Sequence, residues 1–307
     1  MTNEQRVKNL SVPQGVVDVV IDTDAFNEID DQFAIAYLLK HAEKLNTVAL
    51  YTAPFAPFYN GLPLEDRAKE GMEKSYDEIL KVLNLLGEKR EVFKGSERYL
   101  PDENTFLDSP SARDLAKRAM EYSPEKPLYV IAIAAITNIA SALLMNPAIA
   151  ENIVVVWLGG HAQHYTHTKE FNMWQDVAAA RVVMKSGAPF VQLPCNGVVS
   201  AFTSSRPELE HWLVGKNDLA DYLARNAIHF MDMRVAGTPW SKPIWDVTAV
   251  AWLLNEDDKF MESRIMPTYL PGYDGNYEGE PLETPMRYVY HIRRDGLMKD
   301  LFEKLTK

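Results

Sequence analysis

The stretch VVIDTDAFNEIDD, residues 19–31, joins an apolar, β-branched run to a cluster of acidic residues. Asp22 and Asp24 are two residues apart, so in an extended chain their side chains leave the same face. Asp30 and Asp31 open a helical pattern, where the positive end of the helix dipole partly offsets their charge. Like charges this close repel one another, and oxygen ligands suit a hard divalent ion. The stretch therefore predicts a strand, an acidic turn that favours a bound cation, and a helix.

Strand-like and helix-like runs alternate outward from this stretch. Strand-like runs fall at 15–22, 46–53, 126–134, 152–160 and 188–195, and helix-like runs at 30–45, 65–87, 136–147 and 177–187. This alternation predicts an α/β fold, a doubly wound and mostly parallel open sheet of the Rossmann-like kind, with helices on both faces. Ligands bind beyond the carboxyl ends of the strands in such sheets, which is where the acidic cluster falls.

Local signals suggest where individual elements begin and end. Gly87 is a plausible C-cap for the long helical run, and Thr137 or Asn138 is a plausible N-cap for the run at 136–147. The segment 266–285 is rich in turn residues, so we expect a loop or hairpin there. No linker-like, repetitive or low-complexity stretch divides the chain, and we expect a single domain over residues 1–307.

Composition narrows the classes of function. The formal net charge is −11 over 307 residues, which disfavours nucleic acid and anionic membranes as partners. The N-terminus lacks the apolar segment of a secretion signal and no run of 18 apolar residues occurs, so we expect a cytoplasmic protein with no membrane contact. The single cysteine, Cys195, excludes an intrachain disulfide and is interpreted as a packing residue.

The acidic motif is ambiguous until its whole length is considered. A D-x-D after a strand is also found in phosphatases of the haloacid dehalogenase type and in surface capping clusters. Here Asp24 is followed by Ala25-Phe26 and then by the pair Asp30-Asp31, which leads directly into an apolar helix. This arrangement resembles the N-terminal signature of the inosine–uridine-preferring nucleoside hydrolase family, in which such a run holds a calcium ion. Five residues (25–29) separate the second Asp from the pair, where the family usually has three.

Further segments resemble the same family in the same order along the chain. They are ITNIA at 136–140, LGG at 158–160, EFN at 170–172 with Asp176 after it, and WDV at 245–247. Each is weak alone, but together they span about 225 residues in family order. The resemblance implies a calcium-dependent hydrolase that cleaves the N-glycosidic bond of ribonucleosides or a related riboside, on the fold predicted above. It also implies a homodimer or homotetramer.

The resemblance also implies a role for individual residues. Calcium would be ligated by Asp24, Asp31, Asp246 and the carbonyl of Thr137, with Asp24 acting as general base toward the attacking water. Asp30, Glu170 and Asn172, with Phe171 beside them, would contact the sugar, and Asp22 would support the cluster. A ring of carboxylates suits the positive charge that develops on the sugar ring when a glycosidic bond breaks.

Two departures from the family bear on the leaving group. Trp245 stands where one branch of the family has a histidine that protonates the departing base, and an indole N–H does not titrate near neutral pH. We expect Trp245 to contact the substrate by stacking on a flat aglycone. His164 stands where the family has a sugar-binding Asn, and we expect it to contact the substrate, as a leaving-group acid or at the sugar's 5′ hydroxyl.

The sequence leaves open other interpretations of the histidines and of the function. His161, His164 and His167 are spaced for a zinc site, although a loop gives such spacing no defined geometry, and ordinary surface histidines are also possible. The altered leaving-group position leaves open a hydrolase of a non-nucleoside glycoside. A calcium-dependent sugar-binding protein without turnover is the alternative outside enzymology.

Overall fold

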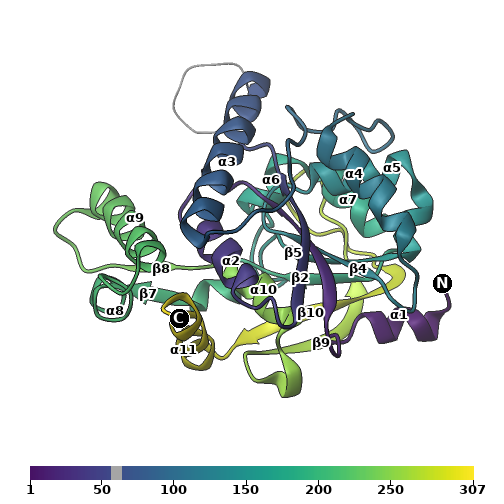
Figure 1. Ribbon diagram of the computed structural model, residues 1–307. Helices are drawn as coiled ribbons and strands as arrows, with labels where there is room; N and C mark the ends of the chain where they lie inside the picture. The colour runs from purple at the N-terminus through teal and green to yellow at the C-terminus, as the bar shows by residue number, and fades with distance from the viewer. Residues whose placement is uncertain (57–63) are drawn as a thin grey trace.

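The computed structural model describes residues 1–56 and 64–307, and its centre is an eight-stranded sheet (Figure 1). The strand order is β3-β2-β1-β4-β5-β6-β10-β9, with every neighbouring pair parallel except β10 and β9. The strands are β1 (Val17–Thr23), β2 (Leu45–Thr52), β3 (Val92–Phe93), β4 (Leu128–Ala132), β5 (Ile153–Leu158), β6 (Phe190–Leu193), β9 (Met261–Thr268) and β10 (Leu282–Ile292).

Helices cover both faces of this sheet. They are α1 (Asn3–Asn9), α2 (Asp30–Leu39), α3 (Leu64–Leu86), α4 (Pro110–Arg118), α5 (Thr137–Met145), α6 (Phe171–Gln175), α7 (Val177–Lys185), α8 (Arg206–Trp212), α9 (Asp218–Val235), α10 (Val247–Leu253) and α11 (Arg294–Leu305). Helices α2, α9, α10 and α11 pack on one face and α4, α5 and α7 on the other, as Figure 1 shows. None of the described helices is long and apolar enough to cross a membrane.

The two cores follow from the alternation of side chains along each strand. In β1, Val19 and Ile21 belong to the core under α2 and α10, whereas Val20 belongs to the core under α4 and α5. All three are fully buried, because a parallel strand covered on both faces has no solvent side. The predicted doubly wound, mostly parallel sheet is confirmed.

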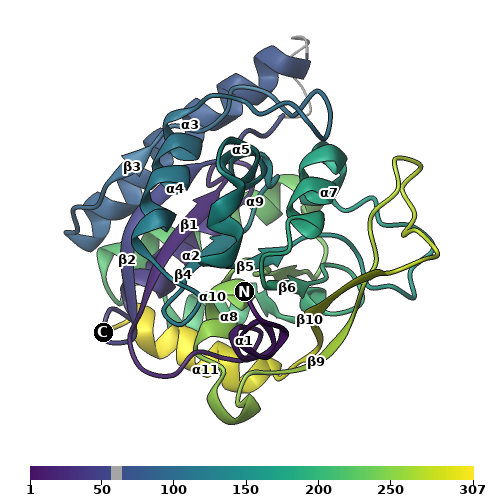
Figure 2. The ribbon, with the colours of Figure 1, turned by 90° about the vertical axis from the view of Figure 1, so that its right-hand side faces the viewer.

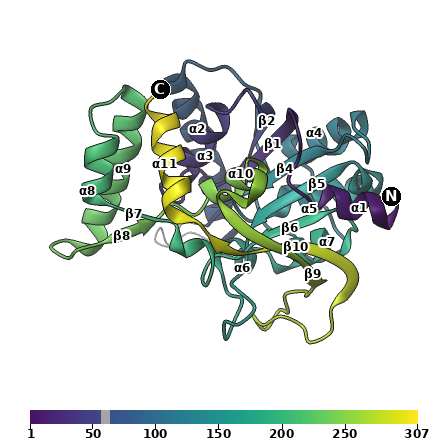
Figure 3. The same ribbon diagram turned by 90° about the horizontal axis from the view of Figure 1, so that it is seen from below.

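Helices α8 and α9 and a small second sheet project to one side of the main sheet (Figure 3). This sheet pairs β7 (Thr203–Ser205) with β8 (Ser241–Pro243) in antiparallel fashion. With three residues each, β7 and β8 are too short to give a periodic pattern, so the sequence does not predict them. These elements place Trp245 and Asp246, because the chain runs from β8 through these two residues into α10.

Gly87 confirms the predicted end of α3, but the predicted N-cap of α5 is wrong. Gly87 has φ of +68° at the end of the helix, the left-handed conformation that glycine adopts without steric cost. Helix α5 begins at Thr137 with Ile136 as N-cap, and no side chain caps it. The Thr137 hydroxyl instead donates to Asp176 at 2.7 Å, and the amide of Asn138 reaches Asp22. Both side chains therefore bond to residues distant in sequence and do not cap the helix.

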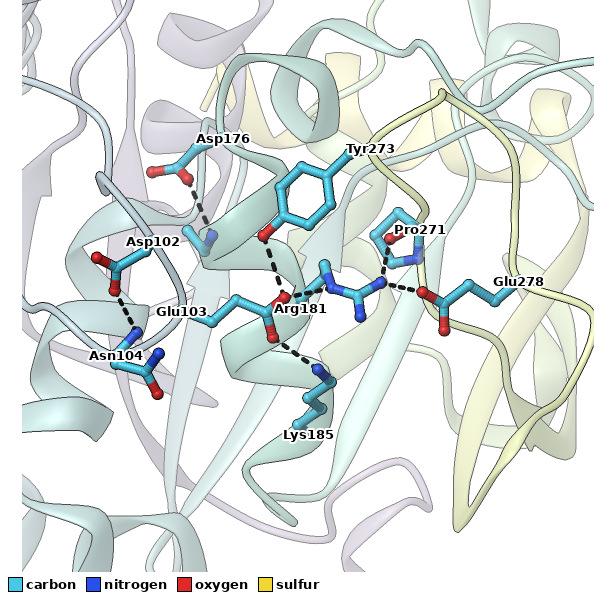
Figure 4. A network of polar contacts seen from close by, with 10 residues as sticks. Asp102, Glu103, Asn104, Asp176, Arg181, Lys185, Pro271, Tyr273 and Glu278 are labelled. Carbon is cyan, nitrogen blue, oxygen red and sulfur yellow. Dashed lines mark hydrogen bonds and ion pairs between the residues drawn. The ribbon is translucent and has the colours of Figure 1, made fainter.

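The segment 266–285 contains the ends of β9 and β10 and the loop of their hairpin, as expected, and the loop extends away from the body in Figure 2. A polar network ties this loop to α7 (Figure 4). Arg181 donates to Glu103 at 2.6 Å and to the carbonyl of Pro271 at 2.8 Å, and it also pairs with Glu278. Tyr273 donates to the same Glu103. The guanidinium therefore joins the hairpin to the helical layer.

Candidate active site

A cavity of about 310 Å³ lies at the carboxyl ends of the central strands. Its lining comes from the segments after β1, β4, β5 and β6, together with the start of α10. Because these strands are parallel neighbours, the residues that follow them meet at one edge of the sheet. The volume is in the range of pockets that hold small molecules. This edge is where the sequence placed the acidic cluster.

Four buried aspartates, Asp24, Asp30, Asp31 and Asp246, form one side of this cavity, which we call the carboxylate wall. One carboxylate oxygen from each of Asp30, Asp31 and Asp246 lies within 4.8 Å of the others. Burial and then the charge of Asp30 raise the pKa of Asp31 to about 7. Burial, followed by the charges of Asp31 and Asp30, also raises the pKa of Asp24. The structure thus brings together carboxylates that disfavour one another's ionisation.

The chemistry of this wall fits a hard divalent cation. Asp24 Oδ2 is fully buried and accepts no hydrogen bond from the residues the structure describes. Thr23 donates its hydroxyl to Asp31, and the main-chain N–H of Asp246 donates to Asp30 at 3.3 Å. These few hydrogen bonds do not offset four buried charges, whereas a cation held by oxygen ligands does. The donor set contains only oxygen and is therefore unlike a zinc site of Cys and His.

A protein cation, Lys242, reaches the wall, although nothing in the sequence pattern pointed to it. Lys242 in β8 is 3 % exposed, pairs with Glu28 and places its Nζ 3.7 Å from Asp30 Oδ1. The same Nζ lies 3.8 Å from the ring centroid of Trp245. Glu28 belongs to the run of five residues that is longer than usual for the family, so Lys242 fastens that loop to the wall. A lone Lys in a short strand carries no sequence signal of burial.

Asp22, which the family resemblance places in support of the acidic cluster, is buried in β1 and is absent from the described lining of the cavity. Its carboxylate is buried and accepts a hydrogen bond of 2.8 Å from Asn138 Nδ2. Burial raises the pKa of Asp22 to about 7. Asn138 also accepts the main-chain N–H of Ser96, next to Gly95. A Cβ on Gly95 would meet the Thr52 carbonyl at 1.8 Å, so only glycine allows this close approach.

Thr137, the predicted source of a main-chain ligand, is fully buried at the start of α5. The described residues that line the cavity include Ile133 and do not include Thr137. Ile133 directly follows β4, and its N–H donates to the carbonyl of Asp22. Of these two residues, Ile133, four positions earlier in the chain, is the one that lines the cavity.

The segment Glu170-Phe171-Asn172, expected to contact the sugar, lines the cavity. The Glu170 carboxylate accepts the N–H groups of Gly160, Asn172 and Met173 at 2.9–3.0 Å and so caps α6. Burial raises the pKa of Glu170 to about 7, with these N–H groups acting in the opposite direction. The Asn172 amide donates to the Leu158 carbonyl. These contacts fix the side chains of Glu170 and Asn172 at the cavity.

The structure brings a different histidine to the cavity from the one expected. His164 is exposed and is absent from the described lining, whereas His161 is 5 % exposed and lines the cavity. The ring of His167 lies 5.4 Å from that of His161. Among residues 1–56 and 64–307, the metal-type clusters comprise the three aspartates and no histidine group. The position of His161, directly after the Gly159-Gly160 strand end, was the available signal.

Trp245 lines the cavity together with Asn196 and Cys195, which follow β6. Its indole N–H donates to Ser200 Oγ at 2.9 Å. Burial raises the pKa of the Cys195 thiol, so this cysteine stays a neutral lining residue. The sequence interpretation of Cys195 as packing alone omitted its place at the cavity.

The model of the inosine-uridine preferring nucleoside hydrolase family matches residues 19–280. The chain belongs to this family. The match begins in β1 and includes the four aspartates of the carboxylate wall, Glu170 and Trp245. A nucleoside hydrolase fold is thus the frame for the cavity described above.

Individual nucleoside hydrolases are also similar to this chain. The putative pyrimidine-specific ribonucleoside hydrolase RihB of Shigella boydii is 27% identical over 173 residues, covering 50% of this chain and 69% of that one. RihB of Escherichia coli O157:H7 is 27% identical over 174 residues, which is 54% of its length. The chain therefore matches about half to two thirds of these relatives. The plant nucleoside hydrolase PpNRh1 shares the fold, with a TM-score of 0.73 at 20% identity over 96% of this chain and 99% of that one.

Proposed function

We propose that this protein hydrolyses the N-glycosidic bond of ribonucleosides with the help of a bound calcium ion. The observation that carries the proposal is the carboxylate wall, in which four buried aspartates face a cavity large enough for a nucleoside. Family membership supports the reaction class, and the oxygen-only donor set supports calcium over a softer metal.

Asp24, Asp31 and Asp246 would hold the ion, together with a main-chain carbonyl. The family resemblance implies the carbonyl of Thr137, but Ile133 lines the cavity and Thr137 does not, which favours Ile133 as the source of this carbonyl. When bound, calcium would offset the charge of the wall and make a coordinated water more acidic. Asp24, whose second oxygen has no described partner, is then the group that accepts a proton from the attacking water.

The other site residues bind the sugar and stabilise its positive charge. Asp30, Glu170 and Asn172 face the cavity and accept or donate hydrogen bonds to ribose hydroxyls. As the glycosidic bond lengthens, the sugar ring becomes cationic, and buried carboxylates stabilise that charge strongly because little water screens them. Phe171 and Trp245 supply apolar surface for a flat aglycone. The carboxylates thus favour the transition state over the neutral substrate.

The decisive experiment measures release of free ribose and free base. Purified protein is incubated with purine and pyrimidine ribonucleosides, and in parallel with ribosides whose aglycone is not a base, with calcium or with chelator. Ribose release from nucleosides that requires calcium supports the proposal. Release only from other ribosides assigns a different glycosidase activity, and calcium-dependent binding of ribose without release assigns a sugar-binding protein.

Further expectations from the sequence stay predictions. They are a homodimer or homotetramer, a cytoplasmic location and a single domain over residues 1–307. Sedimentation of the purified protein tests the first, and limited proteolysis tests the third.

A further inference from the structure

A chain of hydrogen bonds fixes the groups on the side of the cavity that Trp245 lines. The Trp245 indole N–H donates to Ser200 Oγ at 2.9 Å, and Ser200 Oγ donates to Asn196 Oδ1 at 3.0 Å. The Lys242 ammonium lies 3.8 Å from the Trp245 ring centroid. The indole N–H is therefore already used inside the protein, so Trp245 has no donor left for a departing base.

The same chain defines which nitrogen of His161 carries a proton. The main-chain N–H of Asn196 donates to His161 Nδ1 at 3.3 Å. A neutral imidazole accepts at one nitrogen and donates at the other, so Nε2 carries the hydrogen. Burial and then the neighbouring His167 lower the pKa of His161, which keeps the ring neutral at neutral pH. His161 thus presents one N–H donor.

Asn196 presents the second donor. Because its Oδ1 accepts from Ser200, its Nδ2 is the end of the amide that remains for other partners. Asn196 Nδ2 lies 3.5 Å from His161 Nε2, and both residues line the cavity. Two N–H donors side by side have no hydrogen bond to give each other, so they suit a ligand atom with lone pairs. We call His161 Nε2 and Asn196 Nδ2 the donor pair.

We propose that the donor pair binds a hydrogen-bond acceptor of the aglycone, a carbonyl oxygen or an unprotonated ring nitrogen of a nucleobase. This deepens the proposed hydrolysis and rests on it. The carboxylate wall contains acceptors that suit sugar hydroxyls, whereas a base whose acceptors face the cavity finds its N–H donors at His161 and Asn196. Trp245 then serves as surface beside the base and not as its proton donor.

The reaction gives the donor pair a role in departure of the base. The bond between the anomeric carbon and the base nitrogen breaks, and its electron pair leaves with the base. Water forms the new bond to the anomeric carbon and passes one proton to Asp24. The departing base spreads its added electron density onto its carbonyl oxygens and ring nitrogens, where two N–H donors stabilise it, and it then takes up a proton from solvent.

Substitutions at the donor pair separate binding of the aglycone from binding of the sugar. The variants are His161→Phe and Asn196→Leu, with His161→Gln to restore an N–H donor and His291→Phe, an exposed histidine on β10, as control. The substrates are inosine, uridine and 4-nitrophenyl riboside, whose leaving group departs with little help. We expect kcat/KM on the preferred nucleoside to fall about 10- to 100-fold in the first two variants, the loss typical of one good hydrogen bond.

On the nitrophenyl riboside the same variants should lose less than about threefold, and His161→Gln should recover part of the nucleoside activity. Equal losses on both substrates would make the pair a sugar contact and overturn the inference. A loss in His164→Phe with none in His161→Phe would also overturn it. Melting curves of each variant show whether it folds, and the glutamine variant keeps the test valid if phenylalanine does not.

Titration calorimetry with the free bases hypoxanthine and uracil separates this inference from the proposed function. Binding of a free base that weakens about tenfold in His161→Phe and Asn196→Leu supports the donor pair even if no nucleoside is hydrolysed, in which case the proposed function fails alone. Nucleoside turnover with unchanged base binding and unchanged kinetics in both variants overturns the donor pair and leaves the proposed function standing.

Discussion

The carboxylate wall and the donor pair face one cavity but are built in opposite ways. Three of the four aspartates of the wall lie within eight residues of one another, Asp24 just after β1 and Asp30 and Asp31 at the start of α2. His161 and Asn196 are 35 residues apart and meet only because β5 and β6 are neighbouring strands. The wall collects charge that needs an outside cation, whereas the donor pair is neutral and held by hydrogen bonds within the protein. We therefore expect substitutions in the wall to change both turnover and stability, and substitutions in the donor pair to change recognition of the aglycone.

Replacing Asp24 by Asn should give the largest effect, a loss of turnover. Loss of a general base lowers turnover about 10²–10⁴-fold, and loss of a calcium ligand would add to that. Steady-state rates at saturating calcium, with calorimetric calcium binding, separate the two contributions. Asp18→Asn is the matched control in β1, the strand that leads to Asp24, because the Asp18 carboxylate contacts Asn46 and Tyr122 instead of the cavity. Wild-type turnover in Asp24→Asn would refute the role of base.

Replacing Lys242 by Met should test whether the wall depends on its internal cation. Removing one partner of a buried charge pair typically costs about 3–5 kcal/mol of unfolding free energy, because the remaining carboxylates are left without compensation. Lys44→Met is the control, since Lys44 pairs with the more exposed Glu256, and it should cost about 0–1 kcal/mol. Urea unfolding in chelator measures both. Equal costs in the two variants would show that Lys242 does not stabilise the wall.

The raised pKa values of the buried carboxylates predict how calcium and pH change the stability of the protein. The pKa of Asp31 is raised from 3.8 to about 7 and that of Glu170 from 4.5 to about 7. Between these limits the folded chain keeps protons that the unfolded chain has lost. Without divalent ions, stability should therefore fall as pH rises from about 4 to 7.

Calcium competes with the protons of its proposed ligands, such as Asp31, so its stabilising effect should grow over the same interval, reaching about 2.7 kcal/mol at a hundredfold excess over its dissociation constant. Thermal melts with calcium and with chelator at several pH values measure the effect. A calcium effect that is independent of pH, or a melting temperature in chelator that rises over this interval, would contradict the arrangement of charges.

Tyr277→Phe should give the smallest loss of activity and should affect only the donor pair, not the carboxylate wall. The Tyr277 hydroxyl donates to the His161 carbonyl at 3.0 Å and accepts from Gln192 at 2.9 Å. Losing one such hydrogen bond costs about 1 kcal/mol, so nucleoside kcat/KM should fall about fivefold while calcium binding stays unchanged. Tyr273→Phe, on the same hairpin loop but bonded to Glu103, is the control. A change in calcium affinity would show that the two sides are not independent.

The sequence alone determined the sheet, its central strands and most of the carboxylate wall. Residues 19–31 combine a short β-branched run with acidic residues at the strand end, and this information is contained in one contiguous segment. Asp246 entered through resemblance at 245–247, and the cavity contains it. Strand and helix periods act over a few residues, so they can be detected without knowing which segments become neighbours.

Tertiary structure alone decided which side chains complete the site. Lys242 reaches Asp30 because β7 and β8 carry it back to the wall, and Glu28 of the long loop meets it there. His161 lines the cavity and His164 does not, although both belong to the same loop. The physical reason is that burial and pairing depend on contacts between segments far apart in sequence. The Gly159-Gly160 strand end places His161 near the cavity, but its contact with Asn196 depends on β6, which no local pattern around the histidines encodes.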